Sequence, residues 1–370
     1  GVANKHKPVW YIVNYDQLKK HLPYIQTLKL GTVILDESHY IKGSSIRARL
    51  SIKLCEEADR VYLLSGTPIM NRPIELWNQL KALSHELTTG GQYAWIHFIT
   101  RYCNAFQRTA RGHTFWDTRG ASNIPELKEK IKDVFLRREK SEVLDLPAKL
   151  ISKITVEMER LWANKYARAW DDYLEWLRNN PPEDDPDKID RVIMARHLVE
   201  LQKLKQVCSQ AKLERIIEDA ENIIEQGDKV VIFTQYTKTL GELWNGLKKY
   251  GTTGISGATP LDQRTANVDK FQTDPKCKVF IGNTKAAGVG ITLTAASKVI
   301  FADMLWSPAE HEQAADRLHR IGQNEMVNVY YYIAKETIEE EIMQLLEAKA
   351  KLIEALISGT QIKRVKDKSM

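Results

Sequence analysis

The chain has 370 residues, of which 43% are hydrophobic, 28% are charged and 8% are aromatic. This length predicts roughly two domains, and the apolar fraction is large enough for more than one core. No segment approaches the roughly 18 consecutive apolar residues that a membrane span needs, and the start of the sequence has no apolar signal-peptide core. The sequence therefore predicts no membrane partner and does not support secretion.

The basic excess is confined to the first part of the chain. The whole sequence has a net charge of +6, but residues 1–150 alone carry 23 Lys/Arg and 15 Asp/Glu, a net charge of +8. This asymmetry is compatible with a polyanionic partner and with a merely solvated basic surface, and charge alone gives the two interpretations about even odds. The four cysteines lie far apart without a Cys-x-x-Cys pair. Their spacing argues against a disulfide framework or a zinc site and predicts an intracellular, reducing compartment.

The first predicted domain covers residues 1–150. Residues 31–35 (GTVIL) and 61–64 (VYLL) are short apolar runs, and the stretch between them is rich in Arg, Lys, Leu and Ile. Strand, helix and strand at this spacing predict a βαβ unit with parallel strands. Residues 84–135 are mixed, with glycines and aromatic residues, and we expect them to form a helical insertion in this domain.

Residues 151–225 are predicted to be a second helical insertion or linker. Large apolar and aromatic residues recur at helical spacing between positions 161 and 177. Packing explains such a stripe better than ligand binding, at about four to one. The Pro- and acid-rich stretch 179–190 is predicted to be an exposed loop.

Residues 226–357 predict a second α/β domain with a parallel sheet. The predicted strands are 229–236, 278–283, 298–303 and 327–334, and the predicted helices are 237–250, 260–271, 308–320 and about 336–357. The basic tail 358–370 is expected to be disordered. The predicted fold class is therefore α/β, with two parallel-sheet lobes and helical insertions between them.

In open α/β sheets the functional residues lie at the carboxyl ends of strands. Asp36 and Glu37 follow the first predicted strand directly, and His39 lies two residues further on. One carboxylate can hold Mg²⁺ through water while the other orients or deprotonates an attacking water. An acidic pair alone is weak evidence for a catalytic site. Because a strand precedes this pair and a histidine follows it, we favour a functional role over a chance surface pair by about three to one.

Hydroxyls and glycines follow two further strands. Ser65 and Thr67 lie in the SGTP turn after the second strand and can relay hydrogen bonds between neighbouring sites, although a plain turn is the better interpretation in isolation. Gly288 and Gly290 lie in TKAAGVGITLT, where small residues allow close backbone approach to a phosphate. A lone Gly-x-Gly is often only a turn.

Gln313, Arg317 and Arg320 are four and three residues apart within the predicted helix 308–320. This spacing predicts that they share one helix face. Two arginines presented together can clamp a phosphoryl group bidentately, whereas a solvated basic helix is the alternative.

The order of DESH, SGTP, VIFTQY, TKAAGVGITLT and QAADRLHRIGQ resembles the Swi/Snf-type branch of superfamily-2 helicase-like ATPases. The segments NRPIELW and RYCNA are similar to the annealing-helicase subgroup. The resemblance implies two RecA-like lobes, with ATP and Mg²⁺ between them and double-stranded or branched DNA running across both.

The resemblance also implies residue roles. Asp36 would be the Mg²⁺-linked carboxylate and Glu37 the residue that activates water, while Arg317 and Arg320 would be arginine fingers. The residues implied to couple nucleotide state to movement are His39, Ser65, Thr67, Gly288, Gly290 and Gln313. Those implied to approach the DNA backbone are Thr234, Gln235, Thr292 and Trp306, although a core position suits Trp306 equally well.

The sequence departs from the family pattern in having no Gly-Lys-[Ser/Thr] loop. We therefore expect the first lobe to be incomplete here, with the phosphate-binding loop supplied by an upstream segment or a separate chain. The principal hypothesis is an ATP-driven DNA translocase of which this chain is the C-terminal portion. The alternative is an ATPase-inactive DNA-binding or scaffold protein, and a strand-separating helicase is disfavoured on family grounds.

Overall fold

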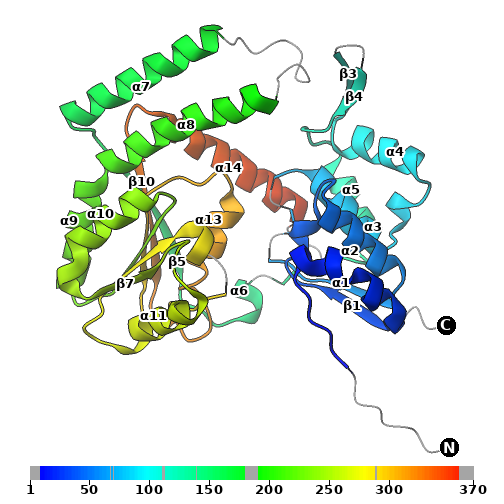
Figure 1. Ribbon diagram of the computed structural model, residues 1–370, viewed down its shortest axis with the longest axis horizontal. Coiled ribbons are helices and arrows are strands. Elements are labelled where there is room, and N and C mark those ends of the chain that lie inside the picture. Colours follow the sequence, from blue (N-terminus) through cyan, green and yellow to red (C-terminus); the bar gives the residue numbers. More distant parts are fainter. Residues whose placement is uncertain are drawn as a thin grey trace, which may run out of the picture. The chain divides into compact units, whose positions relative to one another are not determined.

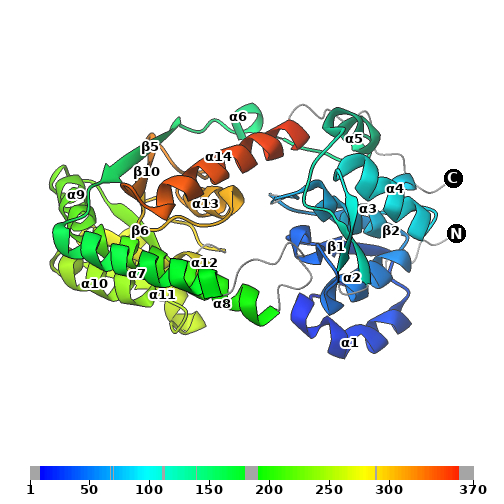
Figure 2. The ribbon, with the colours of Figure 1, turned by 90° about the horizontal axis from the view of Figure 1, so that it is seen from above.

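The computed structural model describes residues 9–66, 68–69, 71–110, 113–138, 140–179, 191–287 and 290–357. The chain forms two compact units, drawn in Figures 1 and 2. The first comprises Gly1–Gln107, Phe115–Leu136 and Ile353–Met370, and the second comprises Arg108–Thr114 and Arg137–Leu352. Several predictions fall outside the described residues, namely those for Thr67, Gly288, most of the loop 179–190 and the tail 358–370.

The first unit is built on a parallel pair of strands, β1 (Thr32–Leu35) and β2 (Arg60–Leu63). Helix α2 (Ile46–Glu56) connects them, so the predicted βαβ unit is confirmed. The helix begins where Ser45 Oγ accepts a hydrogen bond from the Ala48 amide at 3.3 Å, which satisfies one of the free N–H groups of its first turn. One face of β1 and one face of α2 share an apolar core with α1 (Leu18–Ile25).

The remaining elements of this part of the chain are short. They are the single-turn helices η1 (Tyr15–Gln17), η2 (Gln26–Leu28), η3 (Ser38–Ile41), η4 (Pro73–Leu76) and η5 (Glu86–Thr88), the helices α3 (Trp77–Ala82), α4 (Gln92–Tyr102) and α5 (Ile124–Ile131), and a two-stranded sheet of β3 (Phe106–Ala110) and β4 (His113–Asp117). The sheet corrects the prediction of a helical insertion over about 84–135, since the aromatic and β-branched residues of FQRTA and HTFWD favour strands.

The second unit contains a six-stranded sheet in the order β5-β10-β9-β6-β8-β7, and the register given for its neighbours is parallel. Its strands are β5 (Lys149–Val156), β6 (Val230–Thr234), β7 (Thr252–Ile255), β8 (Val279–Asn283), β9 (Lys298–Phe301) and β10 (Val327–Ala334). All four strands predicted for this region are confirmed, and so is the α/β class. Strands β5 and β7, the two edges of the sheet, are additional.

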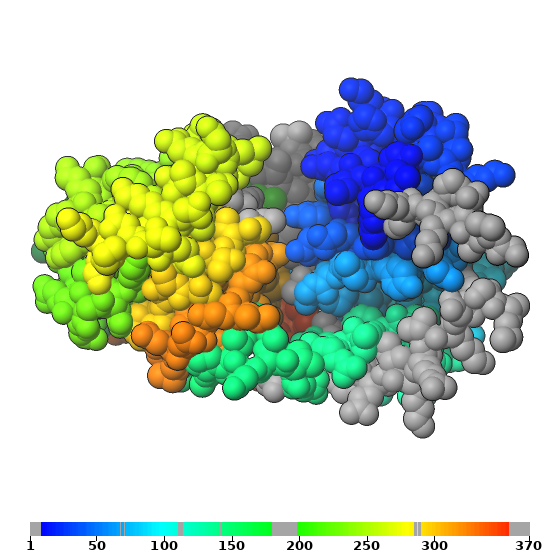
Figure 3. Space-filling model, turned by 90° about the horizontal axis from the view of Figure 1, so that it is seen from below, coloured from blue at the N-terminus to red at the C-terminus, as the bar shows by residue number. Residues whose placement is uncertain are grey.

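Helices pack on both faces of this sheet. The helices of this part of the chain are α6 (Lys140–Val143), α7 (Arg160–Asn179), α8 (Arg191–Ala211), α9 (Leu213–Glu225), α10 (Thr237–Leu247), η6 (Lys248–Tyr250), α11 (Leu261–Thr273), α12 (Thr284–Ala287), α13 (Pro308–Ala315) and α14 (Ile338–Ile357). The central strand β6 is buried along its whole length and sends Val231 and Phe233 into one apolar cluster and Val230 and Ile232 into the other. The outer side of α11 lies at the surface, where it is yellow in Figure 3.

The stripe predicted on the first helix of the insertion packs as expected from Tyr166 onward, whereas Leu161 at its start is exposed. Tyr166 and Tyr173 of α7 are buried in a cluster with Leu204 and Cys208 of α8. Within the part of the chain that the structure describes, no helix combines the length and apolarity needed to cross a membrane.

Candidate functional site

The acidic pair lies in a tight turn at the carboxyl end of β1. Asp36 is exposed, and its Oδ1 atom accepts a hydrogen bond from the Glu37 amide at 3.0 Å. Glu37 adopts a left-handed backbone conformation with φ of 48°, which is uncommon outside glycine. The Tyr15 hydroxyl donates to the Asp36 carbonyl at 2.8 Å and so anchors the turn to η1.

Glu37, His39 and Ser65 are brought together although Ser65 is distant in sequence. The Glu37 Oε2 atom lies 3.2 Å from His39 Nδ1, and the same nitrogen lies 3.3 Å from Ser65 Oγ. Burial lowers the pKa of His39, and the neighbouring Glu37 carboxylate only partly opposes this effect. The imidazole is therefore neutral at physiological pH and can share one proton between a carboxylate and a hydroxyl.

A second set of hydrogen bonds joins the same two strand ends. The Ser38 amide donates to the Leu64 carbonyl at 2.8 Å, and Ser38 Oγ donates to Gln79 Oε1 at 3.2 Å. Gln79 Nε2 in turn donates to the Pro68 carbonyl at 2.6 Å. Gln79, on α3, was not among the predicted site residues, because a lone amide in an amphipathic helix gives no signal in sequence.

In the second unit, the carboxyl ends of β6 and β9 meet at Asp303. Its Oδ2 atom accepts from Thr234 Oγ1 at 2.5 Å and from the Gln235 amide at 2.7 Å. The Gln235 side chain donates from Nε2 to the Met304 carbonyl at 3.0 Å. Thr234 is fully buried, so its hydroxyl holds Asp303, while half-buried Gln235 is the member of the pair nearer to solvent.

Trp306 is half-buried, and its surroundings match a core position. It packs against the apolar cluster that contains Met304 and Ile342, and the Lys205 ammonium lies 4.7 Å from the centre of its ring. Lys349 of α14 donates to its carbonyl at 3.0 Å.

The prediction that Gln313, Arg317 and Arg320 share one helix face is wrong. Helix α13 ends at Ala315, so only Gln313 is helical, and the two arginines lie in the turns that follow. Arg320 Nη1 donates to the Ile291 carbonyl at 3.2 Å and to Thr292 Oγ1 at 3.3 Å. The structure thus brings Arg320 to the segment that carries exposed Gly290, whose φ of 75° suits glycine.

Tertiary contacts explain why the helix stops. Asp316 ion-pairs with Lys140 at 2.7 Å and with Lys149 at 3.5 Å. His319 Nε2 lies 2.8 Å from the Pro147 carbonyl. These contacts tie the chain after α13 to the segment leading into β5, and a continued helix would point the same side chains elsewhere.

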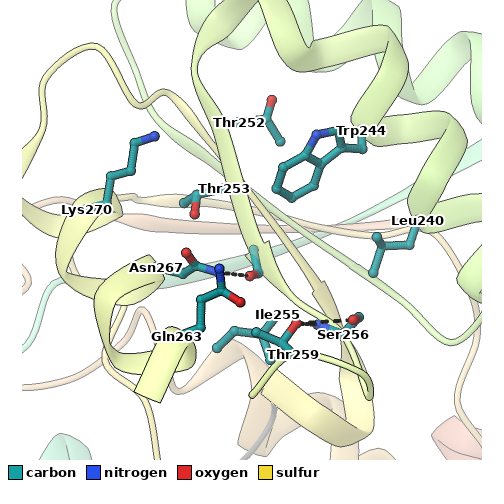
Figure 4. Close-up of a pocket in the computed structure, with 11 residues that line it drawn as sticks. Leu240, Trp244, Thr252, Thr253, Ile255, Ser256, Thr259, Gln263, Asn267 and Lys270 are labelled. Carbon is teal, nitrogen blue, oxygen red and sulfur yellow. Dashed lines mark hydrogen bonds between the residues drawn. The ribbon is translucent and has the colours of Figure 1, made fainter. Parts of the chain in front are cut away.

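A hollow of about 400 Å³ lies beside the edge strand β7 and is separate from all these residues. Figure 4 shows Trp244 and Leu240 of α10 on one side of it and Lys270 and Gln263 of α11 on the other. Asn267 Nδ2 donates to the Gly254 carbonyl at 2.8 Å across its floor. None of the predicted site residues lines it.

Within the described ranges, no three or more His, Cys, Asp or Glu side chains converge as a metal centre. A single exposed carboxylate such as Asp36 nevertheless fits Mg²⁺, which keeps several waters and takes its other ligands from substrate phosphates.

Comparisons with known proteins decide the family. A model of the SNF2-related domain matches residues 4–213, and a model of the helicase conserved C-terminal domain matches residues 211–322. The chain belongs to the SNF2-related family. The resemblance predicted from the five motifs is thereby confirmed.

Relatives of this SNF2-family chain include proteins named as annealing helicases. It is 32% identical over 348 residues to the mouse (Mus musculus) DNA annealing helicase and endonuclease ZRANB3, covering 92% of this chain and 31% of that protein. It is 33% identical over 366 residues to the Caenorhabditis elegans homolog of the SWI/SNF-related matrix-associated actin-dependent regulator of chromatin subfamily A-like protein 1, covering 96% and 50% respectively. The chain thus spans 31% and 50% of the lengths of these two relatives.

Among solved structures, it is similar to the Sulfolobus solfataricus SWI2/SNF2 ATPase core in complex with dsDNA. The TM-score is 0.47 at 26% identity, with 93% of this chain and 72% of that chain covered.

Proposed function

We propose that this chain is the C-terminal portion of an ATP-driven motor that moves on double-stranded or branched DNA. The observation that carries the proposal is the contact of Glu37 with His39, and of His39 with Ser65, at the carboxyl ends of two adjacent parallel strands. An SNF2-family chain with this arrangement has a carboxylate placed for water activation and a neutral relay to the next strand.

The proposed chemistry assigns separate roles to the two carboxylates. Asp36 holds Mg²⁺ through water, and the bound ion supplies charge neutralisation for the phosphates of ATP. Glu37 takes a proton from the attacking water. The resulting change in the charge of Glu37 alters its contact with His39, and His39 in turn alters its hydrogen bond with Ser65. Arg317 and Arg320 are proposed as arginine fingers, a role that is worth about 10³–10⁵ in rate where it has been measured.

The DNA contacts are proposed for the second unit and for the basic part of the first. Gln235 and Thr292 are proposed to approach the DNA backbone, while Thr234 and Trp306 hold the segments that carry such contacts. Gln313, Gly290, Gly288 and Thr67 remain proposed coupling residues. The net charge of +8 over residues 1–150 supplies a nonspecific attraction for phosphate.

We also propose that a further segment, upstream or on a separate chain, supplies the phosphate-binding loop. Parallel sheets are normally covered on both faces, yet the two-stranded sheet of the first unit leaves Ile34 and Tyr62 exposed by 42% and 48%, and Leu64 beside it by 51%. This apolar surface is the kind that neighbouring strands or helices cover. An intracellular location completes the proposal, since all four cysteines are buried free thiols.

The test is DNA-stimulated ATP hydrolysis by the longest natural form of the protein. Replacing Glu37 with Gln keeps the shape but removes the base, so we expect kcat to fall by at least about 100-fold with little change in thermal stability. The matched control is Glu56→Gln, an exposed carboxylate on α2. Absence of DNA-stimulated turnover in the natural form would favour the ATPase-inactive alternative, and turnover unaffected by Glu37→Gln would refute the role of Glu37.

A second experiment tests whether another segment supplies the phosphate-binding loop. The 370-residue chain alone should show little ATP turnover and should gain it when a segment bearing a Gly-Lys-[Ser/Thr] loop is provided in the same chain or as a second one. Full turnover by the 370-residue chain alone would contradict this part of the proposal.

A further inference from the structure

Lys205 of α8 is a buried cation with an unusual environment. Its side chain is 1% exposed, and its Nζ atom makes no hydrogen bond to any residue that the structure describes. It lies over the Trp306 ring, in the connection between β9 and α13. A buried ammonium without hydrogen bonds is unfavourable unless an opposite charge lies nearby.

Two carboxylates act on Lys205, and only one of them has an unused oxygen. Glu339 of α14 is already engaged by Lys212, whose Nζ donates to its two oxygens at 2.8 and 2.7 Å, and by the Ala334 amide at 2.9 Å. Asp303 is buried, and its Oδ1 has no partner among the described residues although Oδ2 accepts two hydrogen bonds. Lys205 and Asp303 form no hydrogen bond with each other, so their opposite charges attract at longer range within the same buried region.

The face of α8 that carries Lys205 also contacts the residues after β6. Gln202 Oε1 accepts from the Tyr236 hydroxyl at 2.6 Å, and Ser209 Oγ lies 2.7 Å from Thr239 Oγ1. Residues 202, 205 and 209 recur at helical spacing and so share one face. This face contacts the segment that follows Gln235 at two points, Tyr236 and Thr239, and Lys205 lies between the two contacting residues of the helix.

We propose that Lys205 is a positioning residue for DNA binding, whose positive charge balances that of the Asp303 carboxylate, so that Asp303 can orient Gln235 at the carboxyl end of β6. The inference rests on the proposed DNA-binding function and adds α8 to it. Without the cation, Asp303 would be a buried, uncompensated charge. It would turn toward water or take up a proton, and either change weakens its bonds to Thr234 and Gln235.

The titration of Lys205 offers a second test, which does not depend on Lys205→Met. Burial lowers its pKa to about 8, with Asp303 and Glu339 opposing this shift and Lys212 adding to it. Other titratable groups also face this region, including Glu339, whose pKa burial raises. Burial lowers the pKa of His311 to about 4, raises that of Cys208 to about 12 and raises that of Tyr236 far above its usual range, while Lys349 holds the Trp306 carbonyl.

The experiment measures the Kd of the chain for a duplex oligonucleotide at fixed ionic strength. Lys205→Met should weaken binding by at least about tenfold, and Lys205→Arg should restore most of it because the guanidinium keeps the charge. The matched control is Lys203→Met on the same helix, whose exposed ammonium pairs with Glu200 at 2.8 Å, and it should change Kd by less than about twofold. Equal effects of the Lys203 and Lys205 substitutions would overturn the inference.

A double-mutant cycle identifies the route. If Lys205 acts through Asp303 on Gln235, the variant Lys205→Met/Gln235→Ala should bind no more weakly than the weaker single variant, within about twofold. Additive losses would overturn the proposed route.

The unsubstituted protein keeps the test informative if Lys205→Met does not fold. Its Kd should rise between pH 7 and 9 with a midpoint near the pKa of about 8, and this rise should be absent in Lys205→Arg. Identical pH profiles would overturn the inference. If the unsubstituted chain does not bind DNA at pH 7 at all, the proposed function fails instead, so the two failures are distinguishable.

Discussion

Buried histidines show how single side chains shape the two units. His39 stands between Glu37 and Ser65 in the first unit. His311 in the second unit accepts from the Leu305 amide at Nε2, at 3.2 Å, while Nδ1 lies 3.3 Å from the Ser307 carbonyl. Both rings have one nitrogen available as an acceptor only while the imidazole is neutral. Their neutrality is therefore part of the folded structure.

The pH dependence of stability follows for His311. Burial lowers the pKa of His311 from 6.5 to about 4. Between these two pH values the unfolded chain binds a proton at His311 and the folded unit does not. The stabilisation is fully present above pH 6.5 and is lost as the pH falls toward 4, by up to about 3 kcal/mol. Urea unfolding from pH 7 to 4.5 measures it. His311→Gln should be less stable at pH 7 but should show a shallower decline, and parallel declines would contradict the prediction.

Elements of the second unit are locked together by a buried ion pair. Lys212 lies between α8 and α9, and its Nζ also donates to the Tyr332 carbonyl of β10 at 2.8 Å. Its carboxylate partner Glu339 opens α14 and is fully buried. Three helices and a strand thus meet at one pair of charges.

Removing one partner of this pair should be costly. Glu339→Leu leaves the Lys212 ammonium buried without its counter-charge, so we expect a loss of about 3–5 kcal/mol of unfolding free energy. The control is Glu157→Gln, which removes a fully exposed partner of Lys335 and should leave the unfolding midpoint unchanged. Equal midpoints for the two variants would show that the buried pair does not lock these elements.

Strand β7 depends on a glycine for its approach to β8. A Cβ atom at Gly254 would lie 1.9 Å from the Ile281 carbonyl oxygen, whereas one at Gly257 would meet open space. Gly254→Ala should therefore destabilise the second unit by about 3 kcal/mol or more, because backbone must move rather than a side chain. Gly257→Ala should be neutral. Thermal melting of the two variants makes the comparison, and equal melting temperatures would refute it.

At the scale of the whole molecule, DNA affinity should depend on salt rather than on base sequence. Phosphate contacts release counterions and carry no sequence information. We expect Kd to rise by at least about 100-fold between about 50 and 200 mM salt, with similar values for unrelated duplexes. Titration of labelled duplexes at several salt concentrations tests both expectations. A salt-independent Kd or a strong sequence preference would contradict the proposed backbone recognition.

The sequence was most informative where local pattern and tertiary structure agree. The run VNVYYYIA predicts β10 with its observed bounds, because a largely buried parallel strand has a nearly continuous apolar and aromatic sequence. Strand β7 (TTGI) was missed, since it is short and holds Gly254. Arg317 and Arg320 were placed on a helix because their spacing permits it, and only the tertiary contacts of Asp316 and His319 end that helix.

The residues around the predicted sites were harder to foresee. Gln79 and Lys205 are polar residues in amphipathic helices, and sequence assigns such residues to the surface by default. Their contacts single them out: Gln79 donates to the Pro68 carbonyl, and the Lys205 ammonium lies over the Trp306 ring. Those contacts depend on the packing of elements that are distant in the chain.

The hydrogen bond from Asn267 to the Gly254 carbonyl has a consequence for solubility. An edge strand offers unpaired peptide groups on which another chain can nucleate an intermolecular sheet. In β7 this row is only four residues long, and one of its acceptors is already occupied from α11. The edge is therefore a poor template for amyloid-like growth as long as α11 stays docked, and aggregation on heating should begin with the detachment of that helix.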